Sequence, residues 1–219
     1  MKQIIYLVLS ITCFQCFSQT HKAVYSAKIE ANPITGDTSF GDEVNPLLEN
    51  NEFYLYFDKE QSYYTSKNVE NNQKDMSDAV GMSYDPIKYN FKSNSFEINV
   101  EADKLYKYIY TSNVNWEITN ETKEIAGYTC IKANGIISGI INPNQKFNII
   151  AWFAPEVAYP VGPGRYAGLP GIIVYSVFQN YYIYKLESIK FNDNSLDINS
   201  IEYQGEPMTQ EQYIEYLKS

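Results

Sequence analysis

The chain lacks most of the side chains on which common enzyme mechanisms depend. Its 219 residues include one histidine, His21, and one arginine, Arg165. Catalytic triads and cysteine–histidine pairs need an imidazole beside the nucleophile, and many zinc sites use histidine ligands. His21 lies near the start of the chain, in a segment that we expect to fray once a leader is removed. The sequence therefore argues against all three kinds of site.

Cysteine and positive charge are scarce as well. Only Cys130 lies outside the first eighteen residues, and one thiol cannot close an intrachain disulfide. We predict that Cys130 is a small buried residue in a strand. The alternative, a reactive nucleophile, would need a basic neighbour that lowers its pKa.

The net charge of −9 leaves no basic patch for a nucleic acid or an anionic membrane surface. We expect no nucleic-acid partner.

The first eighteen residues have the layout of a secretory signal peptide. Lys2 gives a positive start, and the apolar run Ile4–Ile11 is too short to span a bilayer. Small residues then precede a cleavage site after Ser18. Two alternatives stay open: a buried first helix, and a lipoprotein whose cysteine is lipidated after cleavage. We expect residues 1–18 to be removed. Residues 19–219 would then form one exported domain without a transmembrane segment, either periplasmic, associated with the outer membrane or secreted.

Aromatic residues are abundant, with 21 tyrosines and 11 phenylalanines interleaved with isoleucine and valine. Such side chains pack well on a pleated surface, so the composition favours strands. The clearest alternation places Tyr106, Tyr108 and Tyr110 on one face of a strand. The predicted strands are Ala23–Ile29, Glu52–Asp58, Ser62–Ser66, Ile87–Phe91, Ser95–Val100, Lys104–Thr111, Trp116–Ile118, Tyr128–Ala133, Phe147–Phe153, Ile172–Phe178, Tyr181–Phe191 and Leu196–Tyr203.

The segments between these strands predict loops and one helix. Residues 68–84 are polar, with little apolar periodicity, and predict a mobile loop, while Glu121–Gly127 predicts a polar turn closed by glycine. Thr209 and Gln212 have the spacing of a capping box, which predicts a short helix over residues 209–218. The order of elements favours an all-β fold, mainly antiparallel, with a short C-terminal helix.

The stretch Ala151–Phe178 has the strongest conformational requirements. Three prolines and four glycines lie between Pro160 and Gly171, together with Arg165. Residues 169–172 predict a type II β-turn, with Gly171 at the position that needs a positive φ. Because proline lacks the ladder donor, we expect this segment to lie over an edge or an end of the sheet.

These residues resemble the signature of the GLPGLI family, exported proteins common in Bacteroidetes-type bacteria. The core reads GLPGII from Gly168 to Ile173, with isoleucine in place of leucine at position 172. Further matches lie in the hairpin that begins at Phe53, in the strand Ile125–Ala133 and in the residue Trp116 before it. The residues that we assign to the structural motif are Trp152, Pro155, Gly162, Pro163, Gly168, Leu169, Pro170 and Gly171.

The resemblance spans Phe53 to Lys190 and implies a fold rather than a reaction. The family has no established activity or catalytic residues, so the resemblance assigns none to this chain. By analogy of fold, it implies a single curved open sheet or half-barrel, similar to the periplasmic lipoprotein carriers.

Three functions are consistent with these features. The first is a non-enzymatic binding or chaperone-like module that holds an apolar ligand on the concave face of the sheet. Tyr106, Tyr108 and Tyr110 would line that face, together with Tyr182 and Tyr184. The alternative is that these tyrosines cover the core of the sheet.

The second function is that of a structural or interaction protein whose Pro/Gly loop docks on an envelope partner. Arg165 and Tyr166 are its candidate contacts, since a guanidinium can pair bidentately with a carboxylate or a phosphate. The alternative for Arg165 is an internal salt bridge or a solvated side chain. The third function is a carboxylate-based enzyme that uses Glu101 and Asp103, although adjacent acids at a turn are usually solvated. We predict no catalytic residue, metal or cofactor.

Overall fold

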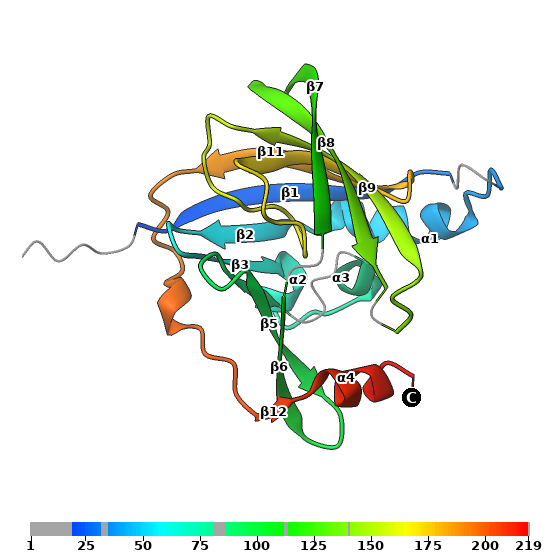
Figure 1. Cartoon of the computed structure of the whole chain (residues 1–219), viewed down its shortest axis with the longest axis vertical. Coiled ribbons are helices and arrows are strands. Elements are labelled where there is room, and N and C mark those ends of the chain that lie inside the picture. The colour runs from blue at the N-terminus through cyan, green and yellow to red at the C-terminus, as the bar shows by residue number, and fades with distance from the viewer. Residues whose placement is uncertain (1–18, 32–34, 81–85, 112–113, 140, 219) are drawn as a thin grey trace, which may run out of the picture.

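The computed structural model describes residues 19–31, 35–80, 86–111, 114–139 and 141–218, so the predicted signal peptide lies outside it. Strands dominate these residues (Figure 1). The elements in chain order are β1 (His21–Ile29), α1 (Ser39–Asn50), β2 (Phe53–Phe57), β3 (Gln61–Ser66), α2 (Lys67–Glu70), α3 (Met76–Val80), β4 (Ile87–Asn90), β5 (Ser95–Glu101), β6 (Leu105–Thr111), β7 (Val114–Ile125), β8 (Tyr128–Ser138), β9 (Lys146–Ala154), β10 (Ile172–Phe178), β11 (Tyr182–Lys190), the 3-10 helix η1 (Ile198–Ser200), β12 (Glu206–Met208) and α4 (Gln210–Tyr216).

The strands form one open sheet in the order β12-β6-β5-β4-β3-β2-β1-β11-β10-β9-β8-β7. The chain enters in the middle with β1 and runs outward through β2 to β6. It then restarts at the opposite edge with β7 and returns through β11, which pairs with β1. The pairs are antiparallel except that of β12 with β6, which is parallel. The predicted all-β, mainly antiparallel open sheet with a short C-terminal helix is confirmed.

The connection from β6 to β7 requires strong curvature of the sheet. Nine strands separate β6 from β7 in the sheet order. In a flat sheet the two would therefore lie about 48 Å apart at the usual strand spacing. Yet β6 ends at Thr111 and β7 begins at Val114, and three peptide steps span at most about 11 Å. The sheet must therefore curl until the end of β6 meets the start of β7, which makes β6 and β7 two arms around a concave face.

The two faces of the sheet carry separate apolar cores. In β2, Phe53, Leu55 and Phe57 belong to the main core on the concave face, whereas Tyr54 and Tyr56 belong to a small convex cluster. The segment 196–203, predicted as a strand, covers that convex cluster with Leu196 and Ile198 instead. It forms η1 because the side chain of Asp197 accepts a hydrogen bond from the backbone N–H of Asn199. The strand prediction is wrong there.

Two other segments differ from expectation. Of the predicted loop 68–84, residues 68–80 contain most of α2 and all of α3, which hydrogen bonds to the Asp78 carboxylate hold in place. Residues 81–84 lie outside the described residues. The predicted turn Glu121–Gly127 reduces to Ala126 and Gly127, both with positive φ, and β7 continues to Ile125. Positive φ at both central residues is the signature of a type I′ hairpin turn. The polar residues before the turn belong to the exposed edge strand β7.

Candidate binding site in the concave face

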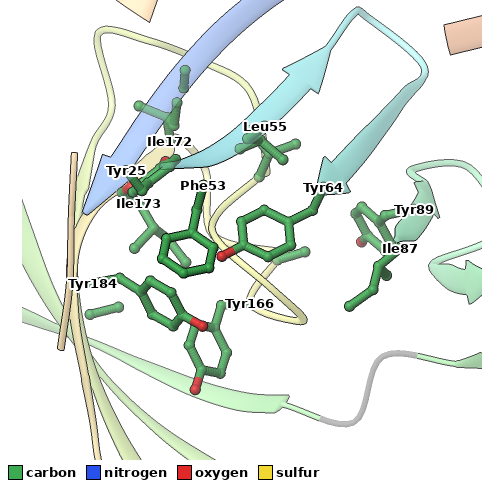
Figure 2. Close-up of a cluster of buried hydrophobic side chains, with 14 of the residues drawn as sticks. Tyr25, Phe53, Leu55, Tyr64, Ile87, Tyr89, Tyr166, Ile172, Ile173 and Tyr184 are labelled. Carbon is green, nitrogen blue, oxygen red and sulfur yellow. The ribbon is translucent and has the colours of Figure 1, made fainter. Parts of the chain in front are cut away.

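The Pro/Gly loop 155–171, which joins β9 to β10, packs onto the middle of the concave face. Its side chains Val161, Tyr166 and Leu169 are buried and belong to the main core. Figure 2 shows the side chains of Tyr166, from the loop, and Tyr184 beside each other, and their ring centroids are 6.2 Å apart. The expectation that the loop would lie over an edge or an end of the sheet is therefore wrong. Proline and glycine prevent ladder pairing, but they leave the interspersed apolar side chains free to pack.

The loop contacts both arms of the curled sheet. The indole nitrogen of Trp116, on β7, donates a hydrogen bond to the backbone oxygen of Ala167 at 2.9 Å. Two residues earlier, the guanidinium carbon of Arg165 lies 5.3 Å from the ring centroid of Tyr110, on β6. The loop is anchored to β10 through the N–H of Ile173, which donates to the Val161 oxygen at 2.9 Å. One loop thus bridges the two arms across the hollow.

Gly171 is required for close packing rather than for a left-handed backbone. The loop glycines with positive φ are Gly164 and Gly168, at 59° and 94°, and not Gly171. A Cβ at Gly171 would lie 2.3 Å from the backbone oxygen of Ala154. The Gly171 N–H donates to the Leu169 oxygen at 2.8 Å, an i to i+2 bond typical of a γ-turn. The type II turn predicted for residues 169–172 is therefore wrong.

The remaining motif residues also have structural roles. Gly162 is buried, and a Cβ there would lie 2.7 Å from both the Tyr166 backbone oxygen and the Ile173 side chain. Pro163 is buried in the loop and Pro155 begins it directly after β9. Trp152 is half-buried on β9. None of these residues presents a reactive group, so this part of the motif shapes the loop.

Two of the three candidate tyrosines on β6 are already engaged by the chain. Tyr108 is buried, and its ring stacks on Tyr213 of α4 with centroids 4.1 Å apart. The hydroxyl of Tyr106 donates to the Asp103 carboxylate at 2.9 Å. Tyr182 and Tyr184 are buried in the main core. Tyr110 lines a cavity, whereas Tyr108, Tyr182 and Tyr184 are buried in the core. Most of these tyrosines therefore cover the core.

That cavity, which we call the arm pocket, has a volume of about 320 Å³ and lies between Tyr110, the loop tip and the β7–β9 arm. Arg165, Tyr166 and Tyr110 supply its polar side chains nearest the loop. This volume falls in the range of small-molecule sites, roughly 300–1,000 Å³. Its apolar walls, which sequence reasoning did not identify, are formed by Val114, Ile137, Ile141, Phe147, Phe178 and Leu217.

The two tyrosine hydroxyls of the arm pocket stay protonated at neutral pH. Burial raises the pKa of Tyr110 to about 12, although the nearby charge of Arg165 acts in the opposite direction. Burial also raises the pKa of Tyr166 well above its usual value. The Arg165 guanidinium is charged at any physiological pH. The arm pocket therefore offers neutral hydroxyl donors beside one fixed positive charge.

His21 is buried in β1 rather than frayed. Its Nδ1 accepts a hydrogen bond from the Asn192 backbone N–H at 3.0 Å, so Nε2 carries the proton and donates to the Tyr159 hydroxyl at 2.8 Å. Tyr159 belongs to the Pro/Gly loop, which the histidine thus helps to fix. His21 is a structural residue.

Cys130 and the two candidate acids form no catalytic group. Cys130 is buried, and burial raises the pKa of its thiol to about 11, which disfavours a thiolate nucleophile. Glu101 is exposed at the end of β5, and Asp103 accepts the bond from Tyr106. Within the described ranges, no three Asp, Glu, His or Cys side chains are placed to share a metal ion.

Comparison with known proteins finds a family model that matches the loop region and solved structures that share the fold. A family model described as a protein of unknown function, Porph_ging, matches residues 140–175. Two crystal structures of PNGF-II, in space groups P21 and C2, match 91% and 92% of this chain with TM-scores of 0.60 and 0.61 and 16% identity. The match covers 33% of the PNGF-II chain, and at this identity it shows the fold alone.

A search of curated proteins by sequence finds no match. Among the described residues, none of the helices has the length and apolar character needed to cross a bilayer.

Proposed function

We propose that this chain is an exported cell-envelope protein of the GLPGLI type that acts as a non-enzymatic binding or chaperone-like module. The GLPGII core of the resemblance lies within the region matched by the family model. Export is supported by the signal-peptide layout of the first eighteen residues. The ligand is an apolar molecule held in the concave face of the curled sheet.

The main support for this proposal is the presence of the arm pocket in the concave face. The Pro/Gly loop fills the middle of the concave face, so the ligand site is narrower than the whole face. What remains is a cavity of about 320 Å³ whose apolar walls come from the β7–β10 side of the sheet and from Leu217, with Tyr110 of β6 on the opposite side. Ile141 and Leu217 line it and are 50% and 40% exposed. Apolar side chains around a concave opening favour an apolar ligand.

The alternative, in which the loop docks on an envelope partner, has less support. Arg165 is half-buried and lines the arm pocket instead of standing on the outer surface. Gly162, Pro163 and Gly164 are buried as well. The exposed residues of the loop are Glu156, Ala158, Gly168 and Pro170, which present little side-chain surface to a partner.

A binding measurement with the neutral dye Nile red tests the proposal. We expect residues 19–219 to bind the dye with increased fluorescence, and uncharged dodecanol to displace it. Ile137→Trp should fill the arm pocket and weaken dye binding at least tenfold. Ile136→Trp is the matched control, because Ile136 is the neighbouring residue on β8, is exposed and does not line the pocket. Absence of dye binding at high micromolar concentration, or equal losses in both variants, would contradict the proposal.

A further inference from the structure

The positive charge of Arg165 has no internal counter-charge in the part of the chain that the structure describes. Its guanidinium lies over the ring of Tyr110 and hydrogen-bonds to the side chain of Tyr213, and no described carboxylate forms an ion pair with it. The described lysines that form salt bridges do so near the surface, as Lys107 does with Glu97 at 3.5 Å. The chain's one guanidinium is thus placed against aromatic rings in an acidic protein.

Three hydrogen-bond donors around the arm pocket also lack acceptors. The Nε of Arg165 and the hydroxyls of Tyr110 and Tyr166 are buried, and none has a hydrogen-bond partner among the described residues. All three residues line the arm pocket. Because Tyr110 and Tyr166 stay protonated at neutral pH, their hydroxyls can donate to an anion. A buried donor without an acceptor is costly, and a cationic one more so.

Apart from Ser138, Asn142 and Gln145, the rest of the arm pocket is apolar, so its two parts suit the two ends of an amphiphile. Donors and a positive charge lie at the loop end, and branched and aromatic side chains from β7 to β10 and from Leu217 line most of the remainder. From this arrangement we infer that the arm pocket binds a single-chain amphipathic anion. Its carboxylate pairs with Arg165, Tyr110 and Tyr166, and its alkyl chain lies along the apolar walls.

A carboxylate fits the donors better than an uncharged polar head. The planar guanidinium matches the two oxygens of a carboxylate, and bonds between charged partners are about twice as strong as neutral ones. The net charge of −9 provides no general attraction for anions, so preference for an anion must come from the local site. The inference rests on the proposed function and adds the charge of the ligand to it.

The test compares laurate with dodecanol, which share a twelve-carbon chain and differ in the head group. Both are titrated into Nile red-loaded protein at pH 7.5, below the micellar concentration of laurate. We expect laurate to bind about tenfold to a hundredfold more tightly than dodecanol. Arg165→Gln should remove this preference while dodecanol still binds. The control Lys107→Gln removes a positive charge from the outer face of the same arm and should keep the preference.

A second pair of variants tests the inference independently, in case Arg165→Gln does not fold. Tyr110→Phe removes one unpaired hydroxyl and should weaken laurate binding severalfold without changing dodecanol binding. Tyr106→Phe removes a hydroxyl that is bonded to Asp103 and should change neither. Equal affinity for laurate and dodecanol in the unmodified protein would overturn the inference and leave the proposed function standing. Failure of both ligands to bind would overturn both.

Discussion

Two buried polar groups of this molecule differ in how completely the chain satisfies them. One surrounds Asp78, which is fully buried in α3 and accepts hydrogen bonds from the Asn51 side chain, the Ser66 hydroxyl and the Asp75 backbone N–H. The other surrounds Arg165 in the arm pocket, where buried donors have no acceptor among the described residues. Both groups bury polar atoms, but only the first is closed within the chain.

The difference separates a structural role from a binding role. A closed network contributes its hydrogen bonds in every state of the folded protein, so its loss should lower the free energy of unfolding. An open set of donors contributes little until an acceptor arrives, so its loss should change binding and leave stability nearly unchanged.

Substitution of Asp78 should give the largest loss of stability. Asp78→Ala leaves the donors of Asn51, Ser66 and Asp75 buried without an acceptor, and should lower the free energy of unfolding by about 3–5 kcal/mol. Asp78→Asn keeps one acceptor oxygen and should cost less. Asp42→Ala, an exposed acid in α1, is the control and should cost about 0.5 kcal/mol. Urea unfolding measures all three, and equal effects of Asp78→Ala and Asp42→Ala would contradict the structural role.

The two motif glycines should differ because their constraints differ. Gly171→Ala places a methyl group against the Ala154 backbone oxygen and should cost about 3 kcal/mol. A Cβ at Gly168 would meet nothing within 4 Å. Gly168→Ala should therefore lower the free energy of unfolding by about 1–2 kcal/mol, which is the cost of a left-handed backbone at a residue other than glycine. Thermal unfolding of both variants checks the order. A larger loss for Gly168→Ala would show that backbone geometry, and not the contact, selects glycine at position 171.

Substitution of Arg165 should leave stability nearly unchanged while it alters binding. Arg165→Met keeps most of the aliphatic stem and removes a half-buried charge that no described carboxylate balances. The free energy of unfolding should change by less than about 1 kcal/mol in either direction. Urea unfolding without added ligand is the measurement. A loss comparable to that of Asp78→Ala would place Arg165 among the structural groups.

His21 should give a small dependence of stability on pH. Burial lowers the pKa of His21 in the folded protein, although the charge of Asp58 opposes this effect. The unfolded state therefore binds more protons below about pH 6.5, and stability should fall as the pH decreases through the folded pKa. His21→Gln should flatten this part of the pH profile of urea unfolding. An unchanged profile would exclude His21 as its source.

The sequence predicts the strands well because their faces alternate locally. The tyrosines of β6 share one face, as the alternation of residues 105–111 indicates, and the capping box of Thr209 and Gln212 begins α4. The failures have different causes. Residues 68–80 fold around Asp78 through polar contacts that leave no apolar period, and the packing of Gly171 against Ala154 is visible only in three dimensions.

The candidate site is predicted only in part for the same reason. Arg165, Tyr166 and Tyr110 stand out in the sequence, because one is the only arginine and the others lie in a distinctive loop and an alternating strand. The walls formed by Val114, Ile137 and other residues come together only when the sheet curls and brings β6 to β7. Local periodicity carries no information about that closure.

The uniqueness of Arg165 allows a direct test of the central claim, that the open donors of the arm pocket receive an anionic ligand. Protein labelled with ¹⁵N-arginine should give one side-chain Nε–H signal. We predict that laurate shifts this signal strongly, that dodecanol moves it little, and that Lys107→Gln leaves both responses unchanged. A signal that stays in place while laurate binds would contradict the claim.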